Sequence, residues 1–121
     1  MRNYKNLGVW QNADELTFQI YRVTRNFPPE EIYGITSQLH RAAYSVPANI
    51  VEGAARESNV EYLRFLSMAR GSLAEVEYFL HLANRLDYLS ESDSKQLTKL
   101  VNYTFAALSG LVKSIRESLE E

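Results

Sequence analysis

The sequence holds one set of side chains that could bind a metal ion. Glu77 and His81 lie one helical turn apart, and the helical hairpin expected here places His40 opposite position 77. Two histidines and a carboxylate can hold a metal and leave coordination positions open. The alternative is that all three lie on the solvated flanks of two helices. Because helix-bundle carboxylate sites carry a repeated Glu-x-x-His pattern that this sequence lacks, we expect neither a metal nor a cofactor.

Residues for covalent catalysis are scarce. The sequence contains no cysteine and two histidines. It also lacks G-x-S-x-G, a Gly-rich phosphate loop after a strand, and H-E-x-x-H, the motifs that place a nucleophile, a phosphate or a metal-bound water. With so few candidates for a nucleophile or its base, we expect no catalytic residues and no enzyme activity.

Charged residues also stand in or beside the apolar pattern: Arg41, Glu52, Arg56 and Glu75. Glu75 interrupts an otherwise apolar series, where an unpaired carboxylate would be costly to bury. An ion pair between Arg41 and Glu75 would solve this, because the guanidinium group offers a two-pronged donor. We expect this pair to set the register of two helices, with Glu52 opposite Arg64 or its neighbour. The alternative is that Arg41 and Arg56 contact the phosphates of a nucleic acid.

Several of these residues belong to a stretch, 33–56, that predicts a helix despite a proline at its centre. Apolar residues recur through it at three- and four-residue steps: Leu39, Ala43, Val46, Ile50 and Gly53. Pro47 lacks an amide hydrogen, and its ring crowds the carbonyl of Ala43. The apolar phase nevertheless continues beyond it, so we expect one helix that is kinked at Pro47 rather than two elements.

The hairpin formed by this helix and the next brings small and polar residues together. A turn directly after the helix places Pro47 beside Arg70 and Gly71. Gly71 would leave room for the kinked backbone, and Ser72 or Asn49 could donate to a carbonyl that the proline leaves free. The alternative is that these residues only tolerate a tight helix crossing.

Four apolar-periodic segments make up the chain. They begin near Val9, Thr36, Val60 and Ser90, and Pro28-Pro29, Ser58-Asn59 and Tyr88-Leu89 stand between them. A proline pushes the residue before it out of the helical conformation, whereas a serine can cap the helix that follows it. Four helices with short connections predict an all-α, antiparallel, up-down-up-down four-helix bundle, which we expect to be one domain over residues 1–121.

The third segment, from about Val60 to Asp87, carries two apolar series side by side. A helix that packs on one core needs a single apolar stripe of about 100°. The wider face has two explanations, a central helix within the bundle or a surface that packs on another subunit. For a subunit interface, the candidate residues are Phe65, Phe79 and Leu82.

The aromatic content indicates further contact residues. Tyr and Trp suit places that are apolar at one end and wet at the other, as in a core margin or an interface. The sequence does not separate these two uses. The candidates for either are Trp10, Tyr21, Tyr44, Tyr62 and Tyr78.

The composition narrows the class of protein. Of the 121 residues, 45% are apolar and 23% are charged, which is typical of a globular protein. The net charge is −2 and no predicted helix is a basic stripe, so we expect generic nucleic acid to bind weakly. No apolar run reaches the roughly 18 residues of a spanning helix, so we expect no membrane association. A chain without cysteine fits the cytoplasm.

The stretch GITSQLHRAAYSVPANIVEG, followed by Arg56 and by LSMARGSLAEVEYFL, resembles a bacterial four-helix-bundle family. Its members are encoded in intervening sequences of large-subunit ribosomal RNA genes and elsewhere in bacterial genomes. The family is also similar to the accessory variability determinant of diversity-generating retroelements. The resemblance covers nearly the whole chain and implies a homopentamer, a self-associating interaction module of unknown cellular role. The alternative is RNA binding or a reverse-transcriptase accessory protein, although this chain lacks the basic character of some retroelement relatives.

Overall fold

Four helices account for most of the chain in the structure, a computed structural model that describes residues 2–120. They are α1 (Gly8–Thr24), α2 (Ile35–Ala54), α3 (Asn59–Arg85) and α4 (Glu91–Glu120). Two single 3-10 turns, η1 (Tyr4–Asn6) and η2 (Pro29–Glu31), precede α1 and α2. Residues 2–120 contain no strand, so the predicted all-α class is confirmed.

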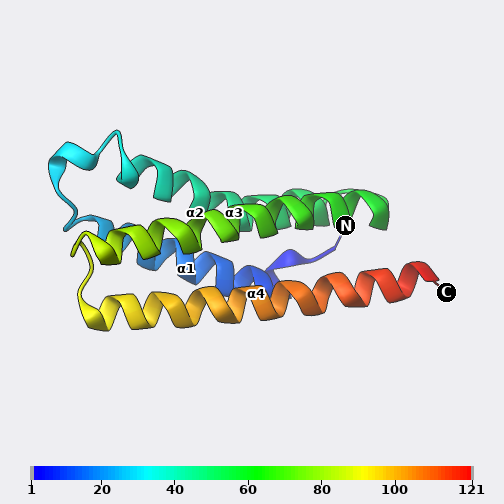
Figure 1. Cartoon of the computed structure of the whole chain (residues 1–121). Coiled ribbons are helices and arrows are strands. Elements are labelled where there is room, and N and C mark those ends of the chain that lie inside the picture. Colours follow the sequence, from blue (N-terminus) through cyan, green and yellow to red (C-terminus); the bar gives the residue numbers. More distant parts are fainter. Residues whose placement is uncertain (1, 121) are drawn as a thin grey trace.

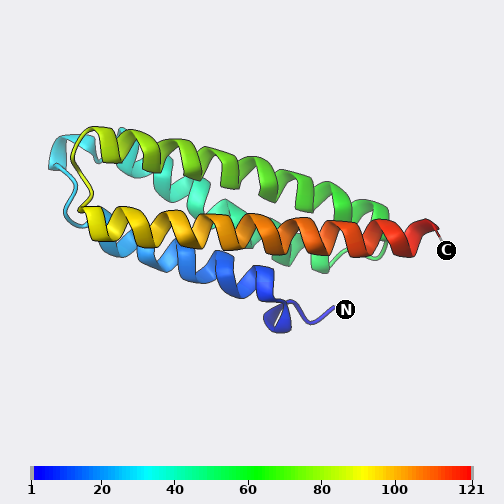
Figure 2. The ribbon, with the colours of Figure 1, turned by 60° about the horizontal axis from the view of Figure 1, so that its bottom comes forward.

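The helices form a four-sided arrangement. Successive helices run in opposite directions along the long axis of the molecule (Figure 1). α1 packs against α2 and α4, and α3 packs against the same two neighbours, with no close backbone contact across either diagonal of the described bundle. The side formed by α1 and α2 therefore lies opposite the side formed by α3 and α4. Beyond the start of α1, the last turns of α4 continue toward the C-terminus (Figure 2).

Short polar signals begin and end the helices. The Ser58 hydroxyl accepts a hydrogen bond from the Glu61 amide at 3.1 Å, and Ser90 accepts one from Asp93 at 3.0 Å, as the sequence predicted. Both bonds satisfy amides that a helix start leaves without partners. α3 ends where Asp87 takes a left-handed backbone conformation, with φ of 60°. This conformation turns the chain toward α4.

The core is built from one apolar stripe of each helix. In each stripe the residues recur at the three- and four-residue steps of an amphipathic helix. Burying such side chains stabilises a fold by roughly 25 cal/mol per Å² of apolar surface removed from water. The largest fully buried side chains are Leu16, Ile20, Leu39, Ile50, Leu66, Leu73, Leu97 and Leu108.

α2 continues without a break through Pro47. The carbonyl that the proline leaves free belongs to Ala43, and the hydroxyl of Thr17 on α1 lies 3.0 Å from it. The same hydroxyl lies 2.8 Å from the Ala13 carbonyl of its own helix, so its single proton is shared. The prediction of one continuous helix is confirmed, and the kink at Pro47 stays a prediction.

Two predictions about the surroundings of Pro47 were wrong. Ser72 does not reach the freed carbonyl, because its hydroxyl donates to the Ser45 hydroxyl at 2.9 Å. Asn49 donates to the Ser45 carbonyl at 2.8 Å, one turn back along α2. Gly71 does not make room for the proline, since no atom lies within 4 Å of the position that a Cβ would take there.

Gly53 is the glycine that a close helix approach requires. A Cβ at this position would lie 2.9 Å from both Phe65 Cβ and Tyr62 Cδ1 on α3. Such distances are too short for van der Waals contact, so only glycine lets α2 and α3 meet in this way. The structure thus gives Gly53 a structural role beside the turn that joins α2 and α3.

Candidate functional site

Three large aromatic side chains lie exposed on the side formed by α1 and α2. Phe18 is 65% exposed, Tyr44 is 50% exposed and Tyr21 is 41% exposed. They lie at one level of the bundle, because Tyr21 stacks on His40, one turn before Tyr44, and because Thr17 next to Phe18 bonds to α2. We call Phe18, Tyr21 and Tyr44 the aromatic band. Single exposed apolar residues are normal on a protein surface, whereas a group on adjoining helices is typical of a contact surface.

His40 packs against Tyr21 of the aromatic band. Its ring stacks on Tyr21 with centroids 3.9 Å apart and planes 16° from parallel. Its Nε2 lies 2.8 Å from the hydroxyl of Thr24 on α1. Partial burial lowers the pKa of His40, because removal of water disfavours the charged imidazole. His40 is therefore a packing residue between α1 and α2.

His40, Glu77 and His81, the residues considered for a metal site, do not lie together. Whereas His40 contacts α1, Glu77 and His81 line a cleft of about 180 Å³ between α3 and α4. Within residues 2–120, no group of three or more His, Asp or Glu side chains is placed to hold a metal ion. The prediction that His40 faces Glu77 was wrong, because His40 points to the α1 side of its helix.

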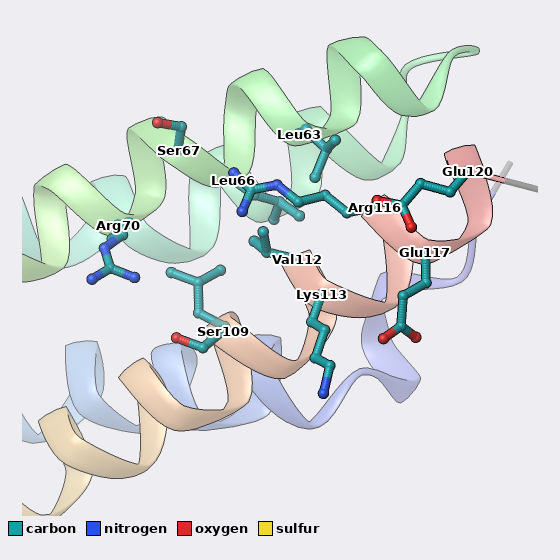
Figure 3. A pocket seen from close by; sticks show the side chains of 11 residues that line it. Leu63, Leu66, Ser67, Arg70, Ser109, Val112, Lys113, Arg116, Glu117 and Glu120 are labelled. Atoms are coloured by element: carbon teal, nitrogen blue, oxygen red, sulfur yellow. The ribbon is translucent and has the colours of Figure 1, made fainter.

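A larger cleft opens between α3 and α4 near the C-terminal end of the chain (Figure 3). It has a volume of about 580 Å³, and Leu63, Leu66 and Val112 line its apolar part. Cationic and acidic side chains also line it: Arg70, Lys113, Arg116, Glu117 and Glu120. We call this the α3–α4 cleft. A concave apolar floor with a charged margin suits a docked side chain or peptide.

The expected ion pair between Arg41 and Glu75 is absent from the described residues, and both side chains are exposed. The two helices are rotated so that position 75 faces solvent, and Glu75 therefore needs no partner. Glu52 instead binds Arg56, just beyond the end of α2, with Oε1 and Nη2 2.9 Å apart. This exposed pair contributes at most about 1 kcal/mol. Arg41 has a free guanidinium in the described structure, unlike Arg56.

The residues predicted on α3 for a subunit interface differ in how far they are buried. Phe65 is 4% exposed, and the guanidinium carbons of Arg56 and Arg64 lie 4.7 and 4.5 Å from its ring centroid. Phe65 is thus covered by its own subunit, and its prediction as an exposed anchor was wrong. Phe79 and Leu82 are half-buried and pack against the core. In the second apolar series of α3, Phe65 packs on Gly53 of α2, whereas Met68 and Leu86 are 42% and 44% exposed, so only part of this face is covered within one subunit.

Two important side chains escaped the sequence-based predictions. Thr17 carries the hydroxyl that serves the carbonyl freed by Pro47, and only its place at the edge of an apolar stripe hinted at this. Arg2 donates to the Ala54 carbonyl at 3.3 Å and lies 4.5 Å from the Tyr62 ring centroid. A cation at the end of α2 favours the negative pole of that helix. Sequence pattern cannot find Arg2, because it precedes every periodic segment.

No described helix combines the length and the apolar character that crossing a membrane requires.

Comparison with known proteins relates the chain to a sequence family and to solved structures. The sequence model of the 23S rRNA-intervening sequence protein family matches residues 5–110. The chain is similar in structure to a crystal structure from Bacteroides thetaiotaomicron, described as a protein with unknown function from the S23 ribosomal protein family. That match has a TM-score of 0.79 and 22% sequence identity, and it covers 87% of this chain and 95% of the other. It shows a shared fold. No curated protein matches the chain.

Proposed function

The chain belongs to the 23S rRNA-intervening sequence protein family, and we propose that it is a non-enzymatic interaction module that associates with copies of itself. The aromatic band carries this proposal. Phe18, Tyr21 and Tyr44 expose much of their surface to water at one level of two adjoining helices. A second protein surface that covered them would remove this apolar area from water. The sequence resemblance suggests a homopentamer.

The aromatic band supports association better than it supports catalysis. Its side chains offer contact area and hydroxyl groups, with no nucleophile or acid–base pair among them. Tyr residues are enriched at interfaces because each combines a large apolar ring with a polar tip. A cytoplasmic location is part of the proposal and rests on the absence of cysteine.

Native mass spectrometry of the intact chain tests self-association. The chain has a mass of 13.9 kDa, and the proposal predicts a species of five chains. A different closed oligomer would retain self-association and refute the pentamer. A spectrum with only single chains would refute self-association, provided that light scattering at the same protein concentration also reports the mass of one chain.

RNA binding is the second candidate, and one observation favours it. Arg70, Lys113 and Arg116 line the same cleft, and cations set against phosphates supply most of the affinity of proteins for RNA. Glu117 and Glu120 line that cleft too and would repel phosphate. We therefore rank RNA second. Submicromolar binding that weakens steeply with added salt, and that falls in Arg41→Ala or Arg116→Ala variants of unchanged fold, would reverse this ranking.

A further inference from the structure

We propose that the aromatic band of one copy, led by Phe18, docks into the α3–α4 cleft of the next copy. The inference rests on the proposed self-association and adds to it the two surfaces that meet. One subunit would thus offer a ridge on one side and a recess on the other. The contact would be head-to-tail, with different residues contributed by the two partners.

The apolar parts of the two surfaces fit one another. Phe18 is 65% exposed and projects from α1, whereas Leu63, Leu66 and Val112 lie between the two helices that form the cleft (Figure 3). The volume of about 580 Å³ is within the range of about 300–1,000 Å³ in which protein pockets hold compact organic groups. An aromatic side chain has room there and would cover the half-buried Leu63 and Val112, whereas Leu66 is already fully buried.

The charges beside these apolar parts are also complementary. Asp14 lies one turn before Phe18 on α1, and both residues are exposed. Arg70, Lys113 and Arg116 line the cleft, and none of these cations has an ion-pair partner among the described residues. Opposite charges at the rim of an interface guide the approach of two surfaces and fix their register. An acid one turn from the inserted ring is thus matched by cations around the recess.

The positions of the two surfaces agree with a head-to-tail contact. The aromatic band lies on the side formed by α1 and α2, and the cleft lies on the opposite side, between α3 and α4. Two different surfaces on opposite sides give a heterologous contact, which closes into a ring when the rotation between copies permits. A contact of one surface with itself would stop at two copies.

RNA would use the cleft differently. Phosphates would bind the cations and gain nothing from the apolar floor, and they would meet Glu117 and Glu120 at the same cleft. The aromatic band, with Phe18 at its tip and the acids Asp14 and Glu15 nearby, would use both the floor and the cations. Glu117 and Glu120 would repel any acid, so it is the apolar floor of the cleft that favours a second copy over RNA.

Two variants and their mixture test the assignment. Phe18→Asp removes the apolar tip of the aromatic band and leaves the α3–α4 cleft intact. Lys113→Glu combined with Arg116→Glu reverses the charge of the cleft and leaves the aromatic band intact. All three positions are exposed, so the folds should be unchanged, which circular dichroism checks. Tyr103→Asp is the matched control, because Tyr103 is 55% exposed and lies outside both surfaces.

We expect light scattering to report single chains for each blocked variant and the wild-type mass for Tyr103→Asp. An equimolar mixture of the two blocked variants should form pairs and nothing larger, since only one good ridge and one good cleft remain to meet. A mixture that stays monomeric would refute the head-to-tail contact.

Other outcomes separate this inference from the proposed function. If the wild-type chain is monomeric, self-association and the inference both fail. If the wild type is assembled and both blocked variants keep its mass, self-association stands and the assignment of surfaces fails. If the cleft variant keeps the wild-type mass but loses binding to a structured RNA, the cleft is an RNA site and the inference is refuted.

Discussion

Gly53 and Gly71 both lie within helices, but they differ in the space that surrounds them. Gly53 faces Tyr62 and Phe65 at distances that exclude a Cβ, whereas Gly71 lies on an exposed part of α3 with open space around it. The sequence offers both as glycines within helices and gives no sign of the difference. What separates them is the rotation of each helix about its own axis.

Substitution of each glycine by alanine should therefore have opposite effects. Gly53→Ala should lower the free energy of unfolding by about 1–3 kcal/mol, because the added carbon overpacks the contact between α2 and α3. Gly71→Ala should raise it by about 0.5–1 kcal/mol, because alanine favours an exposed helix interior. Urea unfolding of the two variants measures both changes. Equal effects of the two substitutions would contradict the close approach at Gly53.

His40 should make stability depend on pH. Burial lowers its pKa in the folded protein from the ordinary value of 6.5, so the unfolded chain binds more protons in the interval between the two pKa values. The stability contributed by neutral His40 is present in full above pH 6.5 and is lost as the pH falls through the folded pKa.

Comparison of the wild type with His40→Gln isolates this contribution from that of the carboxylates. The melting temperature of the wild type should fall more steeply below pH 6.5 than that of the variant. Parallel pH profiles of the two proteins would show that His40 titrates equally in both states.

At the scale of elements, the sequence predicted the four helices and the level at which α2 and α3 meet. The hairpin register placed Ser72 near Pro47, and its hydroxyl lies 2.9 Å from that of Ser45, two residues before the proline. The same register placed Arg41 level with Glu75, yet both side chains are exposed. Register fixes the level of a residue along the axis, while rotation about the axis decides which side chains face the neighbour. Periodicity predicts this rotation poorly where a helix carries two apolar series.

The link between α1 and α2 depends on the missing amide of Pro47. Thr17→Val should lower the free energy of unfolding by about 1–3 kcal/mol, because it leaves the Ala43 carbonyl without its hydroxyl donor. In a Pro47→Ala background, the restored backbone amide can serve that carbonyl, so the same substitution should cost less.

A double-mutant cycle of these variants in urea measures the coupling between the two positions. Thr17→Ser is the matched control, since it keeps the hydroxyl and removes a methyl group. Equal losses for Thr17→Val in the two backgrounds would show that Thr17 serves its own helix alone, through the Ala13 carbonyl.

At the scale of the whole molecule, the location of exposed aromatic residues and clefts decides where an interface can form, and the number of helices does not. The sequence predicted an interface on α3 at Phe65, Phe79 and Leu82, of which Phe65 is buried and the other two pack against the core. The structure places three exposed aromatic residues at one level of α1 and α2, with single ones, Tyr78 and Tyr103, on α3 and α4, and it places the larger described cleft between α3 and α4. Exposed Phe and Tyr residues have the same sequence signature as buried ones, so only the packing of all four helices separates them.

Light scattering on a dilution series of the wild-type chain, with Phe18→Asp and Tyr103→Asp beside it, tests the central claim of self-association most directly. The wild type and Tyr103→Asp should hold a mass several times 13.9 kDa at micromolar protein, with five chains expected, whereas Phe18→Asp should shift to a single chain. A wild-type chain that remains soluble at 13.9 kDa across the series would contradict the claim. The aromatic band would then be an exposed surface without a second copy to cover it.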